Sequence, residues 1–100
     1  MIEVRQTIEF SSWLHRLKDD KAAARIIARI RRMEQGNPGD VRSVGAGVME
    51  MRVDYGPGYR VYYIEHGSMI VILLCAGDKR TQAADIKRAR SFARDIRENG

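Results

Sequence analysis

With 100 residues, the chain is long enough for one domain and too short for two. Lys and Arg total 18 against 13 Asp and Glu, and the resulting net charge of +5 favours a polyanion or an acidic protein as partner. The longest apolar run is too short to span a membrane, and no N-terminal secretion signal is present. A single cysteine, Cys75, suits a reducing compartment, and no patterned set of cysteines and histidines is present. We therefore expect a cytoplasmic protein that needs no metal or other cofactor.

The first third of the chain predicts a strand followed by two helices. Apolar and charged residues alternate before Thr7, which is typical of a strand, and Thr7 offers an N-cap for the first helix. Asp19 or Asp20 can cap the second helix, which Gly36 and Pro38 end. The apolar stripes consist of Phe10, Trp13, Leu14 and Leu17 in the first helix and of Ala23, Ile26, Ile27, Ile30 and Met33 in the second. These helices predict a hairpin that requires a sheet to pack on.

The middle of the chain predicts that sheet. Residues 48–53 alternate, and residues 59–65 alternate again after a Tyr-Gly-Pro-Gly turn. Residues 69–76 are apolar throughout, which predicts the central strand. The preceding residues 37–47 are polar and rich in glycine, and predict an irregular loop.

A last helix is predicted to begin at Thr81 or Gln82. Its narrow apolar stripe consists of Ile86, Ala89, Ala93 and Ile96, flanked by Phe92. The predicted order is therefore β-α-α-β-β-β-α over residues 1–100. This order indicates a single α+β domain of two layers, with the helical hairpin packed on a mainly antiparallel sheet.

One face of the predicted sheet is cationic. Alternation places Arg52, Arg60 and Tyr62 on the same face, Glu50 projects there with Arg52, and Lys79 follows the last strand near its edge. Metal-independent cleavage of RNA needs a base for the 2′-hydroxyl proton, an acid for the leaving 5′-oxygen and cations for the charge on phosphate. Such a face therefore predicts anion recognition with proton transfer on RNA.

Each group on this face has a candidate role in that chemistry. Arg60 and Arg52 suit the phosphate, because a guanidinium grips it through a planar fork. Glu50 is the candidate base; Lys79, if neighbouring cations lower its pKa, or His66 is the candidate acid. The side chains expected to contact RNA, with the tyrosines stacking on bases, are Tyr62, Tyr55, Arg80, His66 and Gln82.

Simpler interpretations account for the same residues. Glu50, Arg52 and Arg60 can form a cross-strand ion pair on an exposed sheet face, and His66 can be a solvated turn residue. Gln82 suits a first helical turn without any further role. Seven basic residues against two acidic ones over residues 79–97 can bind a polyanion, meet an acidic protein or simply be solvated.

Three motifs in this order identify a resemblance to a known family. They are GVMEMR at residues 47–52, YGPGYRVYY at residues 55–63 and GDKRTQAADI at residues 77–86. With the helical segment around residues 10–14, they make nearly the whole chain similar to the RelE/ParE superfamily of type II toxin–antitoxin toxins. The most similar branch is the HigB-like one, often called addiction module killer proteins.

This resemblance implies a microbial-RNase-like fold and a metal-independent endoribonuclease that cuts mRNA in the ribosomal A site. A cognate antitoxin, of the helix-turn-helix type, would neutralise it in a toxin–antitoxin hetero-oligomer. Arg60 corresponds to the arginine that RelE-like nucleases use at the scissile phosphate, and Lys79 and Arg80 correspond to further functional basic residues.

The chain departs from the resemblance near its C-terminus. Several RelE-like nucleases have a catalytic tyrosine or histidine there, and this chain has neither. The identity of the general acid is therefore open. ParE-like relatives share the fold and inhibit DNA gyrase, so fold alone does not choose between these activities. A basic interaction domain without toxicity is a third interpretation.

Overall fold

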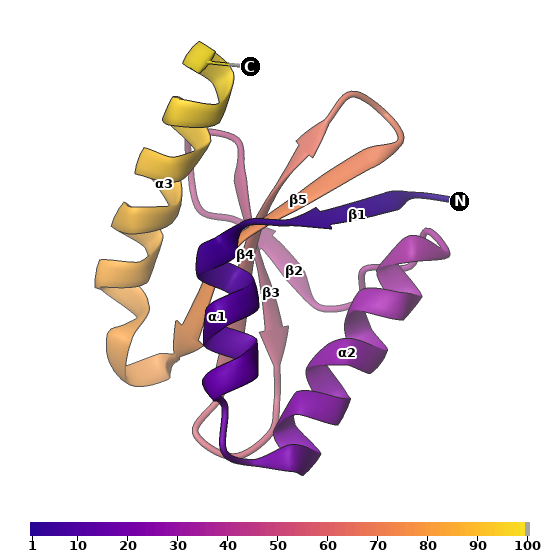
Figure 1. Cartoon of the computed structure of the whole chain (residues 1–100), viewed down its shortest axis with the longest axis vertical. Coiled ribbons are helices and arrows are strands. Elements are labelled where there is room, and N and C mark those ends of the chain that lie inside the picture. The colour runs from indigo at the N-terminus through magenta and orange to yellow at the C-terminus, as the bar shows by residue number, and fades with distance from the viewer. Residues whose placement is uncertain (100) are drawn as a thin grey trace.

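The computed structural model describes residues 1–99 as a mixed α+β domain with a five-stranded sheet (Figure 1). The elements are β1 (Glu3–Gln6), α1 (Ile8–Arg16), α2 (Asp20–Glu34), β2 (Val41–Ser43), β3 (Val48–Val53), β4 (Tyr59–His66), β5 (Ile70–Asp78), the 3-10 helix η1 (Lys79–Thr81) and α3 (Gln82–Asn99). The strand order is β1-β5-β4-β3-β2; β1 and β5 are parallel, and all other neighbours are antiparallel. The prediction of a mainly antiparallel sheet is confirmed.

Local signals set the ends of the first two helices as expected. The Thr7 hydroxyl oxygen accepts a hydrogen bond from the Phe10 N–H at 3.1 Å, and the Asp19 carboxylate accepts from two N–H groups at the start of α2. After α2, Gly36 has φ 89°, the left-handed conformation that glycine adopts without steric cost.

Two predictions about the strands are wrong. Residues 41–43, expected in a loop, form β2 and pair with β3, with Arg42 opposite Glu50. Three residues are too few to show an alternating pattern, so the pairing depends on the neighbouring strand rather than on a local signal. In addition, β4 is the middle strand of the sheet, and β5 lies between β4 and β1.

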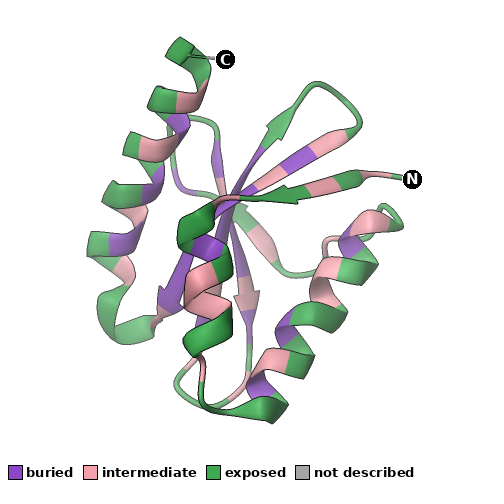
Figure 2. Ribbon diagram, viewed as in Figure 1, coloured by how far each residue is buried: buried purple, intermediate pink, exposed green. Residues whose placement is uncertain are grey.

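The prediction of two layers is also wrong, because helices cover both faces of the sheet. Helices α1 and α2 pack on one face, where Phe10 and Ile26 join Val61 and Tyr63 in an apolar cluster. Helix α3 packs on the other face, where Ala89 and Ala93 join a second apolar cluster. Figure 2 shows buried residues recurring along α3. The uninterrupted apolar run of β5 explains the second layer, because a strand that is apolar at every position buries both of its faces.

The α3 side of the sheet is apolar over only part of its area. Val48, Ile64 and Leu74 lie in the apolar cluster beneath α3. Arg90 and Arg97 of α3 donate hydrogen bonds to backbone carbonyls of the loop between β2 and β3. Beside the start of α3, the ends of β3 and β4 carry polar side chains instead.

Among residues 1–99, no helix has both the length and the apolar composition needed to cross a membrane.

Candidate functional site

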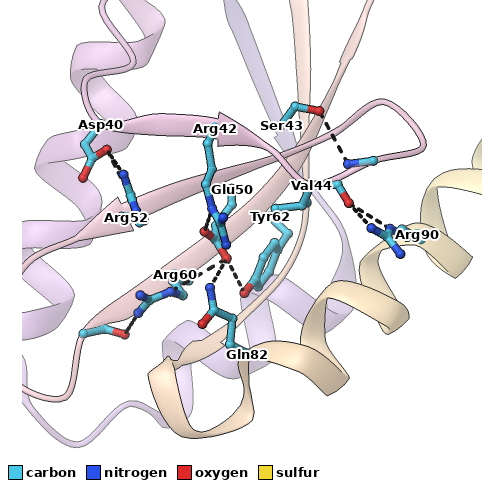
Figure 3. Close-up of polar contacts among 12 residues, drawn as sticks. Asp40, Arg42, Ser43, Val44, Glu50, Arg52, Arg60, Tyr62, Gln82 and Arg90 are labelled. Atoms are coloured by element: carbon cyan, nitrogen blue, oxygen red, sulfur yellow. Dashed lines mark hydrogen bonds and ion pairs between the residues drawn. The ribbon is translucent and has the colours of Figure 1, made fainter.

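A buried carboxylate lies at the centre of the polar region. Glu50 of β3 is 0% exposed, and three donors from three other elements reach it (Figure 3). Arg42 Nε of β2 donates to Oε1 at 2.8 Å, while the Tyr62 hydroxyl of β4 and Gln82 Nε2 of α3 donate to Oε2 at 3.0 and 2.9 Å. Glu50 therefore ties together β2, β3, β4 and the first residue of α3.

Strand register explains this convergence. Arg42, Glu50 and Tyr62 stand directly opposite one another on neighbouring strands, and their side chains point to the same face. Burial by itself would raise the pKa of the Glu50 carboxyl. The hydrogen bonds from Arg42, Gln82 and Tyr62 outweigh burial and hold that pKa below its ordinary value, so Glu50 is anionic at neutral pH.

Arg60 lies beside this carboxylate with part of its guanidinium unused. Its Nε is 3.8 Å from Glu50 Oε2, and its Nη1 donates to the Gly58 carbonyl oxygen at 2.8 Å. The Arg60 side chain is 13% exposed, and its buried Nε has no hydrogen-bond partner. The guanidinium is thus held in one orientation, with its buried Nε on the side of Glu50.

Two further cations lie close to Arg60. Arg52 stands opposite Arg60 in the sheet and pairs through Nη2 with Asp40 Oδ1 at 2.9 Å. Lys79 lies beside the turn that contains Gly58. A Cβ atom placed on Gly58 would be 3.8 Å from Lys79 Cβ and 3.1 Å from Arg60 Nη1, so all three residues lie close together. An open cleft of about 330 Å³ is lined by Asp40, Arg52, Val53, Asp54, Gly58, Tyr59 and Arg60. We call it the arginine cleft.

Helix α2 fixes one wall of the arginine cleft. Arg29 Nη1 donates to the Arg52 carbonyl oxygen at 2.6 Å, and Nη2 donates to the Pro38 carbonyl oxygen at 3.0 Å. These bonds hold the segment before β2 against β3 and bring Asp40 to Arg52. The hydrogen bond from Arg52 in turn lowers the pKa of the Asp40 carboxyl.

Burial corrects two predicted roles. Tyr62 is 0% exposed, so its ring cannot stack on a nucleobase, and burial together with its bond to Glu50 raises the pKa of its hydroxyl. Glu50 is equally inaccessible, and its oxygens already accept three hydrogen bonds, so it cannot take a proton from a substrate hydroxyl as the predicted base. The simpler interpretation, a cross-strand ion pair among Glu50, Arg52 and Arg60, is confirmed for Glu50 and Arg60, although Glu50 is buried and not on an exposed face. Arg52 pairs with Asp40 instead.

The remaining predicted residues are dispersed. His66 is exposed at the far end of β4 from Arg60, six residues or about 20 Å along the strand. Tyr55 turns toward α2, where Arg25 Cζ lies 4.6 Å from the centre of its ring. Arg80 is exposed and pairs with Asp78 at 3.0 Å. Gln82 is at the site, but its amide is bound to Glu50 and supports the site from within.

Three residues of the site were missed by sequence reasoning: Arg29, Asp40 and Arg42. Asp40 and Arg42 fall in the segment that was expected to be a loop, and Arg29 lies in the second predicted helix outside its apolar stripe. The one available signal was the β-branched Val41 between Asp40 and Arg42, which is too little to predict a strand.

Within residues 1–99, no three His, Cys, Asp or Glu side chains gather closely enough to hold a metal ion.

The fold and the site thus define a small basic α+β domain with an arginine cleft at one end of its sheet. The model of the family described as Phage derived protein Gp49-like (DUF891) matches residues 12–95. An uncharacterized protein of Haemophilus influenzae strain Rd is 48% identical over 95 residues, which cover 95% of this chain and 96% of that protein. The chain belongs to the Gp49-like family.

Proposed function

We propose that this protein is the toxin of a type II toxin–antitoxin module and that it cleaves mRNA on the ribosome without a metal ion. Membership of a family associated with such modules supports the first part of the proposal. The observation that carries the second part is Arg60, whose guanidinium is oriented by Gly58 and Glu50 and which lines the open arginine cleft. An RNA phosphate is the anion that fits beside it.

The arginine cleft supplies the electrostatic part of this reaction. When the 2′-hydroxyl gives its proton to water, its oxygen attacks phosphorus and the bond to the 5′-oxygen breaks, negative charge accumulates on the non-bridging oxygens. Arg60 and Arg52 would bind those oxygens, and Arg52 would leave Asp40 to do so. We assign protonation of the leaving 5′-oxygen to Lys79, which is exposed beside Arg60.

Glu50 acts through Arg60 rather than on the substrate. It offsets the charge of Arg42 and Arg60 and keeps the guanidinium of Arg60 at the cleft. A buried carboxylate with strong donors stays ionised, so this support persists throughout the neutral pH range. Glu50 is therefore a positioning residue in our proposal.

Such a toxin would act on ribosomes in the cytoplasm, and a cognate antitoxin of the helix-turn-helix type would hold it inactive in a hetero-oligomer. The cationic cleft and the basic surface of α3 are the regions that the antitoxin would cover. The net charge of +5 favours both an acidic antitoxin segment and ribosomal RNA as partners.

The test is to express the protein in a bacterium without its neighbouring gene and to map mRNA 5′ ends within minutes of induction. We expect growth arrest and new ends inside translated codons, both lost in Arg60→Ala. The matched control is Arg5→Ala, because Arg5 is an exposed arginine on the edge strand β1 that pairs only with Glu3. Growth arrest without new ends, or no arrest with soluble protein present, would contradict the proposal.

A further inference from the structure

A second cleft lies at the same end of the sheet, between α1 and η1. It measures about 510 Å³, and apolar side chains of Trp13, Leu17, Tyr59 and Ala76 contribute to its walls. Trp13 is half-buried and braced by two rings, with its centroid 6.2 Å from that of Phe10 and 6.0 Å from that of Tyr59. We call this cleft the tryptophan groove.

The charges around the tryptophan groove balance. Its lining contains three basic side chains, Lys18, Arg80 and Arg88, and three acidic ones, Asp19, Asp78 and Asp85. Asp78 accepts hydrogen bonds from Arg80, and Asp85 accepts from Thr81 and Arg88. A groove with apolar walls, a polar rim and no excess charge suits an uncharged aromatic molecule with its own donors and acceptors better than it suits a phosphate.

The tryptophan groove adjoins the arginine cleft. Tyr59 lines both, and in the turn before it Pro57 lines the groove while Gly58 lines the arginine cleft. In the sheet, Tyr59 pairs with Asp78, and Arg60 pairs with Gly77. A nucleotide chain whose phosphate is bound at Arg60 can therefore extend past Tyr59 so that its next base enters the groove.

We propose that the tryptophan groove binds the nucleobase of the nucleotide next to the phosphate held by Arg60, with Trp13 as its stacking surface. The inference rests on the proposed function, because it makes RNA the occupant. Stacking on an aromatic side chain accepts any base, whereas the carboxylates and guanidinium at the rim can discriminate among bases by their donor and acceptor patterns. The groove thereby gives the cleavage a base preference that the arginine cleft alone cannot supply.

Trp13 also provides the measurement, because it is the only tryptophan of the chain. Adenosine, cytidine and uridine, which have no phosphate, are titrated separately into the purified protein while tryptophan fluorescence is recorded. We expect a saturable change for at least one nucleoside, weakened about tenfold by Leu17→Glu, which places a charge in the apolar wall. Ile27→Glu is the matched control, since Ile27 is a 38% exposed aliphatic residue of α2 outside the groove, and it should bind as the wild type does.

Three results would overturn the inference. The first is no fluorescence change up to millimolar nucleoside, and the second is an equal change in Leu17→Glu. The third is a change caused by the antitoxin but by no nucleoside, and this result would make the groove a protein-binding site. The inference and the proposed function fail separately. Cleavage that depends on Arg60 without a nucleoside response would refute only the groove. Nucleoside binding by a wild-type protein that cleaves no mRNA would refute only the nuclease.

Discussion

The two faces of the sheet are built on different principles. The face under α1 and α2 is closed by apolar side chains along its length, from Phe10 to Tyr63. The face under α3 is apolar only over its middle, and beside the start of α3 it encloses the ionised Glu50 with its donors. Because a buried ion pair stabilises a fold less than well-packed apolar residues do, the second face is specialised for holding charges in place. The α1–α2 face thus supplies most of the apolar core, and the α3 face positions the charges around Arg60.

The largest loss of stability should come from the α1–α2 face. Phe10 is 0% exposed at the centre of its cluster, so Phe10→Ala should lower the free energy of unfolding by about 3–5 kcal/mol, which is close to the whole stability of a small domain. Urea denaturation measures the change. Ile8→Ala on the same helix is the control, because Ile8 is 81% exposed and should cost little. Similar losses for both variants would contradict the assignment of the core.

A smaller loss should come from Glu50→Gln. The amide keeps the shape of the carboxylate but weakens the bonds from Arg42 and Tyr62, which should lower the free energy of unfolding by about 1–3 kcal/mol. The same urea measurement on Glu65→Gln, an exposed glutamate of β4, gives the baseline. A Glu50→Gln protein as stable as Glu65→Gln would show that the buried carboxylate contributes nothing to the folded state.

The pH dependence of stability should separate the two faces further. Since the pKa of Glu50 is lower in the folded protein than its unfolded value of about 4.3, its contribution is complete above that value and is lost as pH falls through the folded pKa. The difference in free energy of unfolding between wild type and Glu50→Gln should therefore shrink from pH 6 to pH 3. Phe10→Ala should differ from wild type by the same amount across that range. A constant difference for Glu50→Gln would contradict the lowered pKa.

The smallest effect on stability is expected at the exposed Arg52–Asp40 pair. Side chains this accessible form ion pairs that contribute little to folding, so Arg52→Ala should melt at nearly the wild-type temperature. Its RNA affinity should fall, however, and the slope of log affinity against log salt concentration should decrease by about one. Asp40→Asn should do the opposite and tighten RNA binding by releasing Arg52. Filter binding over a range of salt concentrations tests both, and an unchanged slope in Arg52→Ala would remove Arg52 from the interface.

Much of this division was predictable from the sequence. Alternation in β3 and β4 correctly predicted that Glu50, Arg52, Arg60 and Tyr62 share a face. The predicted stripes of α1 and α3 lie in the two apolar clusters. The stripe of α2 was wrong at two positions, because Ala22 is buried in the cluster whereas Ala23 and Ile27 lie outside it. These patterns are local, and each reports which side of its own element is buried.

What the sequence did not predict depends on contacts between distant segments. β2 exists because β3 offers an edge to pair with, and Arg42 and Asp40 reach the site only through that pairing. The burial of Tyr62 and Glu50 follows from α3 lying on their face, which the prediction of two layers did not include. Alternation distinguishes the two faces of a strand, but it does not tell whether a helix covers each of them.

The most direct test of the account is the single-turnover rate of mRNA cleavage by purified protein on programmed ribosomes. We expect Arg60→Ala to lower the rate by about 10²–10³-fold and Arg60→Lys to restore only part of it, since lysine keeps the charge and loses the planar fork. Arg5→Ala should cleave at the wild-type rate. A folded Arg60→Ala protein that cleaves as fast as the wild type would contradict the central claim that the α3 side of the sheet holds Arg60 in place for an RNA phosphate.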